Sequence, residues 1–160
     1  MKRFYPNVLP PFPHEPSPDL FEIRRVSDQI GQGVVSLSYF VKGDLVCGFT
    51  GYLMNSITQY SLTLGPNLHI HDPYFMGKVL HSCDPNLFCD MKRRVFIALR
   101  DIAPGELITM DYAQTEEKLF KPFECSCGAP NCRKIIIGRG QKSSRKTVVV
   151  ARSADMAVRK

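Results

Sequence analysis

The chain has 160 residues, 44% of them apolar, and carries a formal net charge of +6. This length and composition suit one domain around a single hydrophobic core and are short for two full domains. No run approaches the roughly 18 consecutive apolar residues of a transmembrane helix, and prolines interrupt the N-terminal stretch where an export signal needs a continuous apolar run. We therefore expect an intracellular, reducing location and no membrane association.

The positive charge is concentrated at the C-terminal end of the sequence. Residues 133–160 contain nine Lys or Arg and a single acidic residue, Asp155, whereas residues 1–132 have a slight excess of acidic side chains. A mildly acidic body tolerates a basic peptide as substrate. The basic tail is either a solvated end or a segment that makes weak contacts with nucleic-acid phosphates.

The first half of the chain predicts an extended arm followed by short strands. Residues 1–20 are rich in proline and favour an arm that lies over the domain instead of a helix. Strands are predicted at 21–25, 34–37 and 41–49, and glycines at 31–33 break the first two apart.

The middle of the chain predicts two more strands and a short helix. Residues 60–64 alternate at the strand period, and a turn leads into a second strand at 68–70. Asp72 followed by Pro73 is a helix-start signal, because the aspartate can cap the first turn and proline suits the first helical position. We therefore predict a helix over residues 74–80.

The last third predicts strands at 95–99 and 106–111 and one helical turn within 115–120. The tail after Arg139 has few aromatic residues and is expected to be poorly ordered. Many short strands with little helix predict a mainly β domain, but a fold class alone names no activity.

Three cysteines within eight residues, Cys125, Cys127 and Cys132, form a Cys-x-Cys-x4-Cys run. In a reducing compartment such a run favours metal binding, although small buried thiols or a disulfide pair are the alternatives. A structural zinc site normally closes at four ligands, so the fourth must come from elsewhere in the fold. Cys83 is the favoured donor, and Cys89 is also within reach.

Four separated stretches together resemble one family. In order and spacing they are similar to the SET-domain protein lysine methyltransferases that carry a zinc-binding post-SET segment. The stretches are Gly31-Gln32-Gly33, His81-Ser82-Cys83-Asp84-Pro85-Asn86, Gly105-Glu106-Leu107-Ile108-Thr109-Met110-Asp111-Tyr112, and the cysteine run from Cys125 to Cys132.

The resemblance covers residues 21–138 and implies the SET fold. That fold consists of several short twisted sheets, a pseudoknot-like threading of the C-terminal part, and a small cysteine-rich post-SET segment. The expected organisation is a proline-rich arm at 1–20, a SET domain at 21–113, a post-SET segment at 114–138 and a basic, disordered tail at 139–160.

The resemblance also implies methyl transfer from S-adenosylmethionine to a lysine side chain, with the two meeting in a narrow channel. A free lysine, whose pKa is about 10.4, is almost fully charged at neutral pH and cannot attack. An apolar channel facing the cofactor's sulfonium disfavours the charged form by desolvation and like-charge repulsion. Alignment of the amine with the methyl group should then supply most of the rate.

Three residues are assigned to the lysine channel and to catalysis by this resemblance. Tyr112 would place its hydroxyl at the inner end of the channel and orient the amine. Tyr60 matches a channel tyrosine more loosely, and an ordinary strand aromatic is the alternative. Met110 stands where the family often has Phe or Tyr, and an apolar side chain there implies that more than one methyl group can be added.

Six residues are assigned to cofactor binding by the same resemblance. The two glycines let the backbone approach a bulky ligand and adopt positive φ angles, although hairpin glycines are common. The histidine would lie beside the adenosine, although a lone histidine is more often structural. The assigned residues are Gly31, Gln32, Gly33, Leu80, His81 and Phe123.

In post-SET enzymes the cysteine of the His-Ser-Cys motif supplies the fourth thiolate to the zinc. The resemblance therefore assigns the metal to Cys83, Cys125, Cys127 and Cys132. This closure would fasten the C-terminal segment across the cofactor pocket and carry Phe123 and residues 135–137 over it as an apolar cover.

The sequence departs from the family at two positions near the cofactor pocket. Leu80 stands where the family usually has Asn, and Lys78 stands near a usually apolar position. Loss of one hydrogen bond typically costs about 0.5 to 1.5 kcal/mol, or roughly three- to tenfold in affinity. These changes put cofactor binding in doubt but leave the fold prediction intact.

The leading hypothesis is a protein-lysine N-methyltransferase that acts on a basic protein, histone-like or ribosomal, as a monomer or homodimer. It would work in the nucleus of a eukaryote or in the cytoplasm of a bacterium. The second hypothesis is a SET-like scaffold without turnover that binds protein or nucleic acid, which Leu80 and Lys78 favour. A zinc module for nucleic acid is disfavoured, because aromatic residues are not interleaved with the basic ones in the tail.

Overall fold

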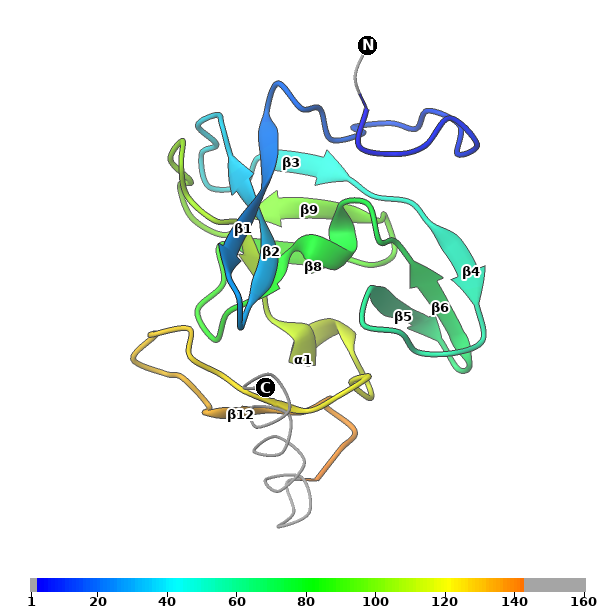
Figure 1. The fold of residues 1–160 in the computed structure, drawn as a ribbon, viewed down its shortest axis with the longest axis vertical. Helices are drawn as coiled ribbons and strands as arrows, with labels where there is room; N and C mark the ends of the chain where they lie inside the picture. Colours follow the sequence, from blue (N-terminus) through cyan, green and yellow to red (C-terminus); the bar gives the residue numbers. More distant parts are fainter. Residues whose placement is uncertain (1–2, 143–160) are drawn as a thin grey trace.

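The computed structural model describes residues 3–142 and is built almost entirely of short strands (Figure 1). The strands are β1 (Phe21–Ser27), β2 (Gly31–Ser36), β3 (Leu45–Gly48), β4 (Tyr52–Met54), β5 (Ser61–Gly65), β6 (Leu68–His71), β7 (Leu80–His81), β8 (Leu87–Asp90), β9 (Val95–Ala98), β10 (Thr109–Met110), β11 (Phe123–Glu124) and β12 (Ile135–Ile136). The described helices are one 3-10 turn, η1 (Met76–Lys78), and one short α-helix, α1 (Tyr112–Thr115).

The strands form five small sheets instead of one large one. Antiparallel sheets are built by β1 with β2, by β3-β9-β8, by β4-β6-β5 and by β11 with β12. Within residues 3–142 the only parallel pair is β7 with β10, where Thr109 lies opposite Leu80 and Met110 opposite His81. This pairing brings the end of the predicted SET region back beside the middle of the chain. The mainly β fold of several short sheets is therefore confirmed.

The main core lies between the β1–β2 hairpin and the two three-stranded sheets, and aromatic rings fill much of it. The rings of Phe21 and Phe75 lie 5.2 Å apart, and those of Phe49 and Phe96 lie 5.1 Å apart. All four side chains are almost completely buried. Aromatic side chains bury large apolar areas, so four of them stabilise a domain whose individual strands are short.

The N-terminal arm packs onto this core without forming a helix or strand in residues 3–20, as its prolines predict. Tyr5 is 2% exposed, and its ring contacts those of Phe12 and Tyr74. Its hydroxyl donates a hydrogen bond of 2.6 Å to the Asp72 carboxylate. Sequence patterns did not predict this buried pair, which fastens the arm to the turn after β6.

The predicted helix over residues 74–80 is wrong, because only one 3-10 turn forms there. Asp72 does cap the turn as predicted, since its carboxylate accepts the backbone N–H groups of Tyr74, Phe75 and Met76. The chain then leaves the turn, and β7 begins at Leu80. A cap signal identifies where a turn starts but does not set its length.

Other element boundaries also differ from the sequence predictions. The strand predicted at 41–49 is shortened to β3, Leu45–Gly48. The glycines at 31–33 belong to β2 instead of separating two strands. The strand predicted at 106–111 is reduced to β10, because Leu107 pairs with Val35 only as an isolated bridge. The helical turn predicted within 115–120 begins earlier, at Tyr112, where the Asp111 side chain accepts the N–H of Ala113.

A second, smaller core holds the cysteine-rich segment. Cys83, Leu119 and Ile136 are buried in it, and Phe123 packs against them. No helix in the described part of the chain is long and apolar enough to cross a membrane. The disorder and phosphate contacts expected of the tail concern mainly residues 143–160, which lie outside the described residues.

Candidate functional site

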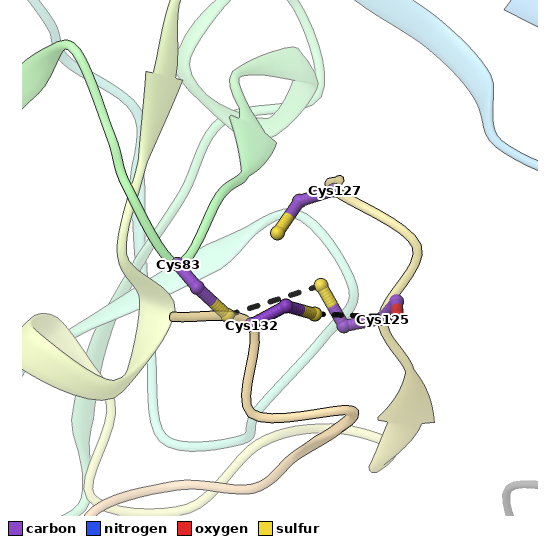
Figure 2. Close-up of side chains that lie close together, drawn as sticks. All are labelled: Cys83, Cys125, Cys127 and Cys132. Carbon is purple, nitrogen blue, oxygen red and sulfur yellow. Dashed lines mark hydrogen bonds between the residues drawn. The ribbon is translucent and has the colours of Figure 1, made fainter. Parts of the chain in front are cut away.

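Four cysteine sulfurs converge from two distant segments (Figure 2). Their Sγ atoms lie within 4.8 Å of one another. Cys83 follows β7, whereas Cys125, Cys127 and Cys132 lie on the loop between β11 and β12. Zinc–sulfur bonds of about 2.3 Å in a tetrahedron place neighbouring sulfurs about 3.8 Å apart. The Cys83–Cys125 sulfur separation of 4.0 Å is close to that spacing, so the four thiols fit a zinc ion.

Cys89, the alternative fourth ligand, is not part of this cluster. It lies in the main core, where its thiol contacts the sulfur of Met91 at 3.4 Å. Burial holds its pKa well above the usual range, so it stays a neutral thiol. Cys47 is also buried in the main core, as expected of a small core residue.

Backbone and amide groups hold the cysteine loop in place. Gly128 adopts a φ of +75°, a conformation that glycine takes without strain in a tight turn. The Asn131 amide donates to the carbonyl oxygen of Cys83 at 3.0 Å, and the Arg133 N–H points at the Cys83 sulfur at 3.4 Å. Although burial opposes it, hydrogen bonds from backbone groups lower the pKa of the Cys127 thiol to about 6. One thiol is therefore readily available as the thiolate that a metal requires.

His81 connects the cysteine cluster to Tyr112. Its side chain is 2% exposed, and burial lowers its pKa to about 4, so the imidazole is neutral at physiological pH. Nδ1 accepts the backbone N–H of Tyr112 at 3.2 Å. The proton is therefore on Nε2, which faces the Cys83 sulfur at 3.4 Å. Both ring nitrogens have protein partners, so the structural role that the sequence left open for this histidine is present.

A cavity of about 220 Å³ opens beside this histidine. It brings together both predicted channel tyrosines and Phe123, which lies two residues before the cysteine run. Its wall is mostly apolar and aromatic, as suits the stem of a lysine side chain. The lining residues are Ile57, Thr58, Gln59, Tyr60, Ser61, Leu62, Met76, Gly77, Val79, Met110, Tyr112, Glu116, Leu119, Phe120, Lys121 and Phe123.

Tyr112 occupies the inner part of this wall at the start of α1. Its hydroxyl donates to the carbonyl oxygen of Val79 at 2.9 Å. Burial, together with the nearby carboxylate of Glu116, holds its pKa well above the usual range, so the phenol is protonated. Its ring lies 5.2 Å from that of His81 and 6.1 Å from that of Phe123, which also lines the cavity.

Tyr60 reaches the cavity because of a glycine that sequence analysis missed. A Cβ atom at Gly77 would lie 2.7 Å from the Cβ of Tyr60, so only glycine fits there. The Asp72 N–H also donates to the carbonyl oxygen of Tyr60 at 2.9 Å. A lone glycine inside a predicted helix was the signal that could have identified this contact.

Lys78, one of the two departures from the family pattern, links two predicted regions. Its ammonium donates to the side-chain oxygen of Gln32 at 2.8 Å. The same Nζ atom lies 5.6 Å from the centre of the Tyr60 ring, within the range of a cation–π interaction. A polar pair therefore joins the glycine motif to the edge of the cavity.

Positions 31 and 33 suit glycine for different structural reasons. Gly31 has a φ of +83°, and a Cβ atom there would meet no neighbour within 4 Å, so its surroundings are open. At Gly33 a Cβ atom would lie 2.8 Å from Leu80 Cδ1 and 2.9 Å from Leu107 Cδ2. Gly33 is thus packed closely against the ends of this chain's own leucine side chains. None of these cofactor-site candidates lines the cavity: Gly31, Gln32, Gly33, Leu80 and His81 are all absent from its wall.

Glu116 is a further cavity residue that sequence analysis missed. It is 3% exposed, and its carboxylate accepts both the N–H and the hydroxyl of Thr63 at 2.9 and 3.0 Å. Burial raises its pKa. Its position four residues after Tyr112, one helical turn away, was the available signal, because such residues share a face.

Residues 31–113, just over half of the chain, match the family model of the SET domain. The chain belongs to the SET-domain family. Among curated SET-domain relatives, Methyltransferase flvH of Aspergillus flavus is 35% identical over 83 residues, which are 51% of this chain and 47% of that protein.

Two histone enzymes are also similar. Histone-lysine N-methyltransferase ash1 of Drosophila melanogaster is 38% identical over 104 residues, which cover 56% of this chain and 4% of that protein. The Histone-lysine N-methyltransferase, H3 lysine-4 specific, of Saccharomyces cerevisiae is 45% identical over 60 residues, 33% of this chain and 6% of that protein. The chain therefore spans about half of one relative and only a small part of the others.

Solved SET structures have the same fold. KRYPTONITE in complex with mCHG DNA and SAH superposes with a TM-score of 0.60 at 30% identity, covering 72% of this chain and 28% of that one. KRYPTONITE in complex with mCHH DNA, H3(1-15) peptide and SAH gives a TM-score of 0.58 at 28% identity, covering 72% and 29%. The SET fold predicted from the four sequence stretches is confirmed.

Proposed function

We propose that this chain is an S-adenosylmethionine-dependent protein-lysine N-methyltransferase whose substrate is a histone or a similar basic protein. The observation that carries the proposal is the cavity that unites Tyr60, Met110 and Tyr112 beside Phe123 and the cysteine cluster. The names of the similar histone-lysine methyltransferases support it, as does the presence of SAH and an H3 peptide in the similar solved complexes.

The cavity wall prepares a lysine for attack. Aromatic and apolar side chains at Tyr60, Met110 and Tyr112 exclude water, so the charged ammonium is disfavoured relative to the neutral amine. The Tyr112 hydroxyl donates to Val79, which leaves its oxygen lone pairs free to accept an N–H from the amine. That contact orients the nitrogen lone pair. The cofactor, when bound, supplies the electrophilic methyl group.

The cofactor face is proposed to lie around the glycine motif and Lys78. Gly31 has open surroundings, and the Gln32–Lys78 pair offers polar groups at the edge of the cavity. The ammonium of Lys78 can balance the carboxylate of S-adenosylmethionine. We infer that this charge offsets the hydrogen bond lost where Leu80 replaces Asn, while His81 and Phe123 form the neighbouring wall. These residues fit the cofactor, although Leu80 contributes only apolar contact.

The four clustered cysteines are proposed to hold a structural zinc. Four protein ligands complete a tetrahedral site and leave no open position for catalysis. The metal would join the segment after β7 to the β11–β12 loop. Because Phe123 begins β11, the same closure would hold its ring over the cavity.

We propose the domain division as an arm at 1–20, a SET domain at 21–113, a post-SET segment from 114 and a basic tail. The sequence places the end of the post-SET segment at 138, and we propose to extend it to Gln141. The support is that the side-chain oxygen of Gln141 accepts the N–H groups of Leu119 and Gly138. For a eukaryotic source we propose a nuclear location, with the tail in contact with chromatin DNA. The cytoplasm is the proposed location for a bacterial source.

Binding and transfer experiments separate this enzyme from a SET-like scaffold. Calorimetric titration of the full chain with S-adenosylmethionine should show one binding site per chain. Labelled cofactor should then transfer its methyl group to lysine in a panel of histones and ribosomal proteins. A chain that binds no cofactor and labels no protein would be the scaffold. The scaffold is not favoured, because the cavity already holds the channel side chains together.

A further inference from the structure

The end of the described chain is fastened to one wall of the cavity. The N–H of Arg139 donates to the carbonyl oxygen of Glu116, and the N–H of Gly140 donates to that of Glu117, both at 2.9 Å. A Cβ atom at Gly138 would lie 2.4 Å from the carbonyl oxygen of Glu117, so this contact is close-packed. The chain near residue 140 therefore has a fixed position.

The segment to which it is fastened lines the candidate lysine channel. Glu116, Leu119, Phe120 and Lys121 all belong to the cavity wall. The side-chain oxygen of Gln141 accepts the N–H of Leu119 at 3.0 Å, so Gln141 contacts a residue of this wall. Figure 1 shows the C-terminal described segment beside the loop that follows α1. Whatever follows residue 142 in sequence therefore starts next to the channel.

The sequence that follows suits the chemistry of the cavity. Residues 143–160 contain five Lys or Arg and one Asp. Lys146 is the first lysine after Lys142, and the five residues from Gln141 to Lys146 span at most about 17 Å. The cavity offers aromatic rings for an aliphatic stem and the carboxylate of Glu116 for an approaching ammonium. Length and charge therefore both favour Lys146 as an occupant.

We propose that Lys146 enters the channel of its own chain and is methylated there, competing with other substrates until it is modified. This inference rests on the methyltransferase activity proposed above. The lysine first loses a proton to water. Its nitrogen then forms a bond with the methyl carbon of S-adenosylmethionine as the methyl–sulfur bond breaks. The sulfur keeps the electron pair, which gives the neutral thioether product and a protonated methylamine.

The test is the mass of the full-length protein, isolated without methyl donor and then incubated with S-adenosylmethionine. The protein should gain the mass of one to three methyl groups, and peptide fragmentation should place them on Lys146. The fraction modified per minute should not change when the protein is diluted tenfold, because the reaction is intramolecular. Lys146→Arg should abolish the gain, whereas the matched control Lys142→Arg should retain it.

Competition provides a second measurement. Lys146→Ala should lower the KM for a histone H3 peptide severalfold with kcat unchanged, because the peptide no longer competes with the tail. An unmodified Lys146, modification elsewhere only, or a rate proportional to protein concentration would overturn the inference. A parallel reaction with histones shows where the failure lies. If histones are labelled but Lys146 is not, only the inference about the tail is wrong. If neither is labelled, the proposed methyltransferase activity is wrong as well.

Discussion

The hydroxyl of Tyr112 donates a hydrogen bond to the carbonyl oxygen of Val79, a residue 33 positions earlier in the chain, at 2.9 Å. Val79 immediately precedes β7 and Tyr112 comes just after β10, so this bond lies at the end of the parallel β7–β10 pair. The strand pairing thus sets the position of the phenol. The candidate catalytic group is held by the fold and not by a mobile loop.

Removal of one cysteine ligand should release the metal. Cys127→Ser leaves three thiolates, and we expect zinc content to fall from one ion per chain to a small fraction of that value. The melting temperature should fall too, because binding of a structural zinc contributes directly to folding. Elemental analysis together with thermal unfolding measures both. The control is Cys89→Ala, a core cysteine outside the cluster, which should retain full zinc content even if it lowers stability.

Gly33→Ala should destabilise the domain through a steric clash. The new Cβ atom would come within 2.8 to 3.1 Å of three side chains, including Leu80. Because the contacted atoms are the ends of side chains that can shift, we expect the lower end of the overpacking range, about 1 kcal/mol of unfolding free energy. Gly65→Ala is the matched control, since a Cβ atom there meets nothing within 4 Å. Urea unfolding measures the free energy of unfolding of each variant. In the double variant, Leu80→Ala should relieve part of the destabilisation caused by Gly33→Ala. If the losses of the two single variants simply add in the double variant, the clash is refuted.

Replacement of Lys78 should weaken cofactor binding more than folding. Lys78→Met keeps an unbranched side chain, shorter by one atom, but removes the ammonium that contacts Gln32 and the Tyr60 ring. Loss of one charge-assisted contact of about 1.5 kcal/mol corresponds to roughly tenfold in affinity. Calorimetric titration with S-adenosylmethionine measures this change. The control is Lys92→Met, at the exposed turn between β8 and β9, which should bind the cofactor as tightly as the wild-type chain does. Equal cofactor affinities for Lys78→Met and Lys92→Met would exclude the proposed role of Lys78.

Met110 should permit more than one methyl group on the substrate lysine. Its side chain is 2% exposed and lines the cavity two residues before Tyr112. A phenol at this position could hold water where the second methyl group must fit, so Met110→Tyr should stop the reaction at monomethyl-lysine. Mass spectrometry of the product peptide distinguishes the two. This role is contradicted if the wild-type chain forms monomethyl-lysine alone and Met110→Tyr gives the same product.

The features that the sequence predicted correctly are those in which a local pattern determines the structure. The apolar run at 95–99 became β9, and the cysteine spacing with Cys83 predicted the cluster that the fold assembles. The apolar run and the Cys-x-Cys-x4-Cys run are each made of residues that are close together in sequence. The family resemblance also assigned Tyr112 and Phe123. Both line the cavity, and their roles in the reaction stay predictions.

The features that the sequence did not predict are those that depend on contacts between distant residues. The contact between Lys78 and Gln32 joins residues 46 positions apart, and that between Glu116 and Thr63 joins residues 53 positions apart. No periodicity or spacing signals such pairs, because they depend on how the small sheets pack. The predicted helix at 74–80 failed for a related reason, since the close contact of Gly77 with Tyr60 is a tertiary constraint.

Methyl transfer by the unmodified chain and by Tyr112→Phe, measured at saturating cofactor and histone, tests the central claim most directly. We expect methyl-lysine on the histone from the unmodified chain and about 100-fold slower turnover in the variant, because one oriented polar contact at the reacting nitrogen is lost. Cofactor affinity should be unchanged, and the freed Val79 carbonyl should cost only about 1 kcal/mol of stability. Tyr39→Phe, which removes an exposed hydroxyl bonded to Asp101, is the control. Equal turnover in the unmodified chain and Tyr112→Phe would contradict a lysine channel that ends at this phenol.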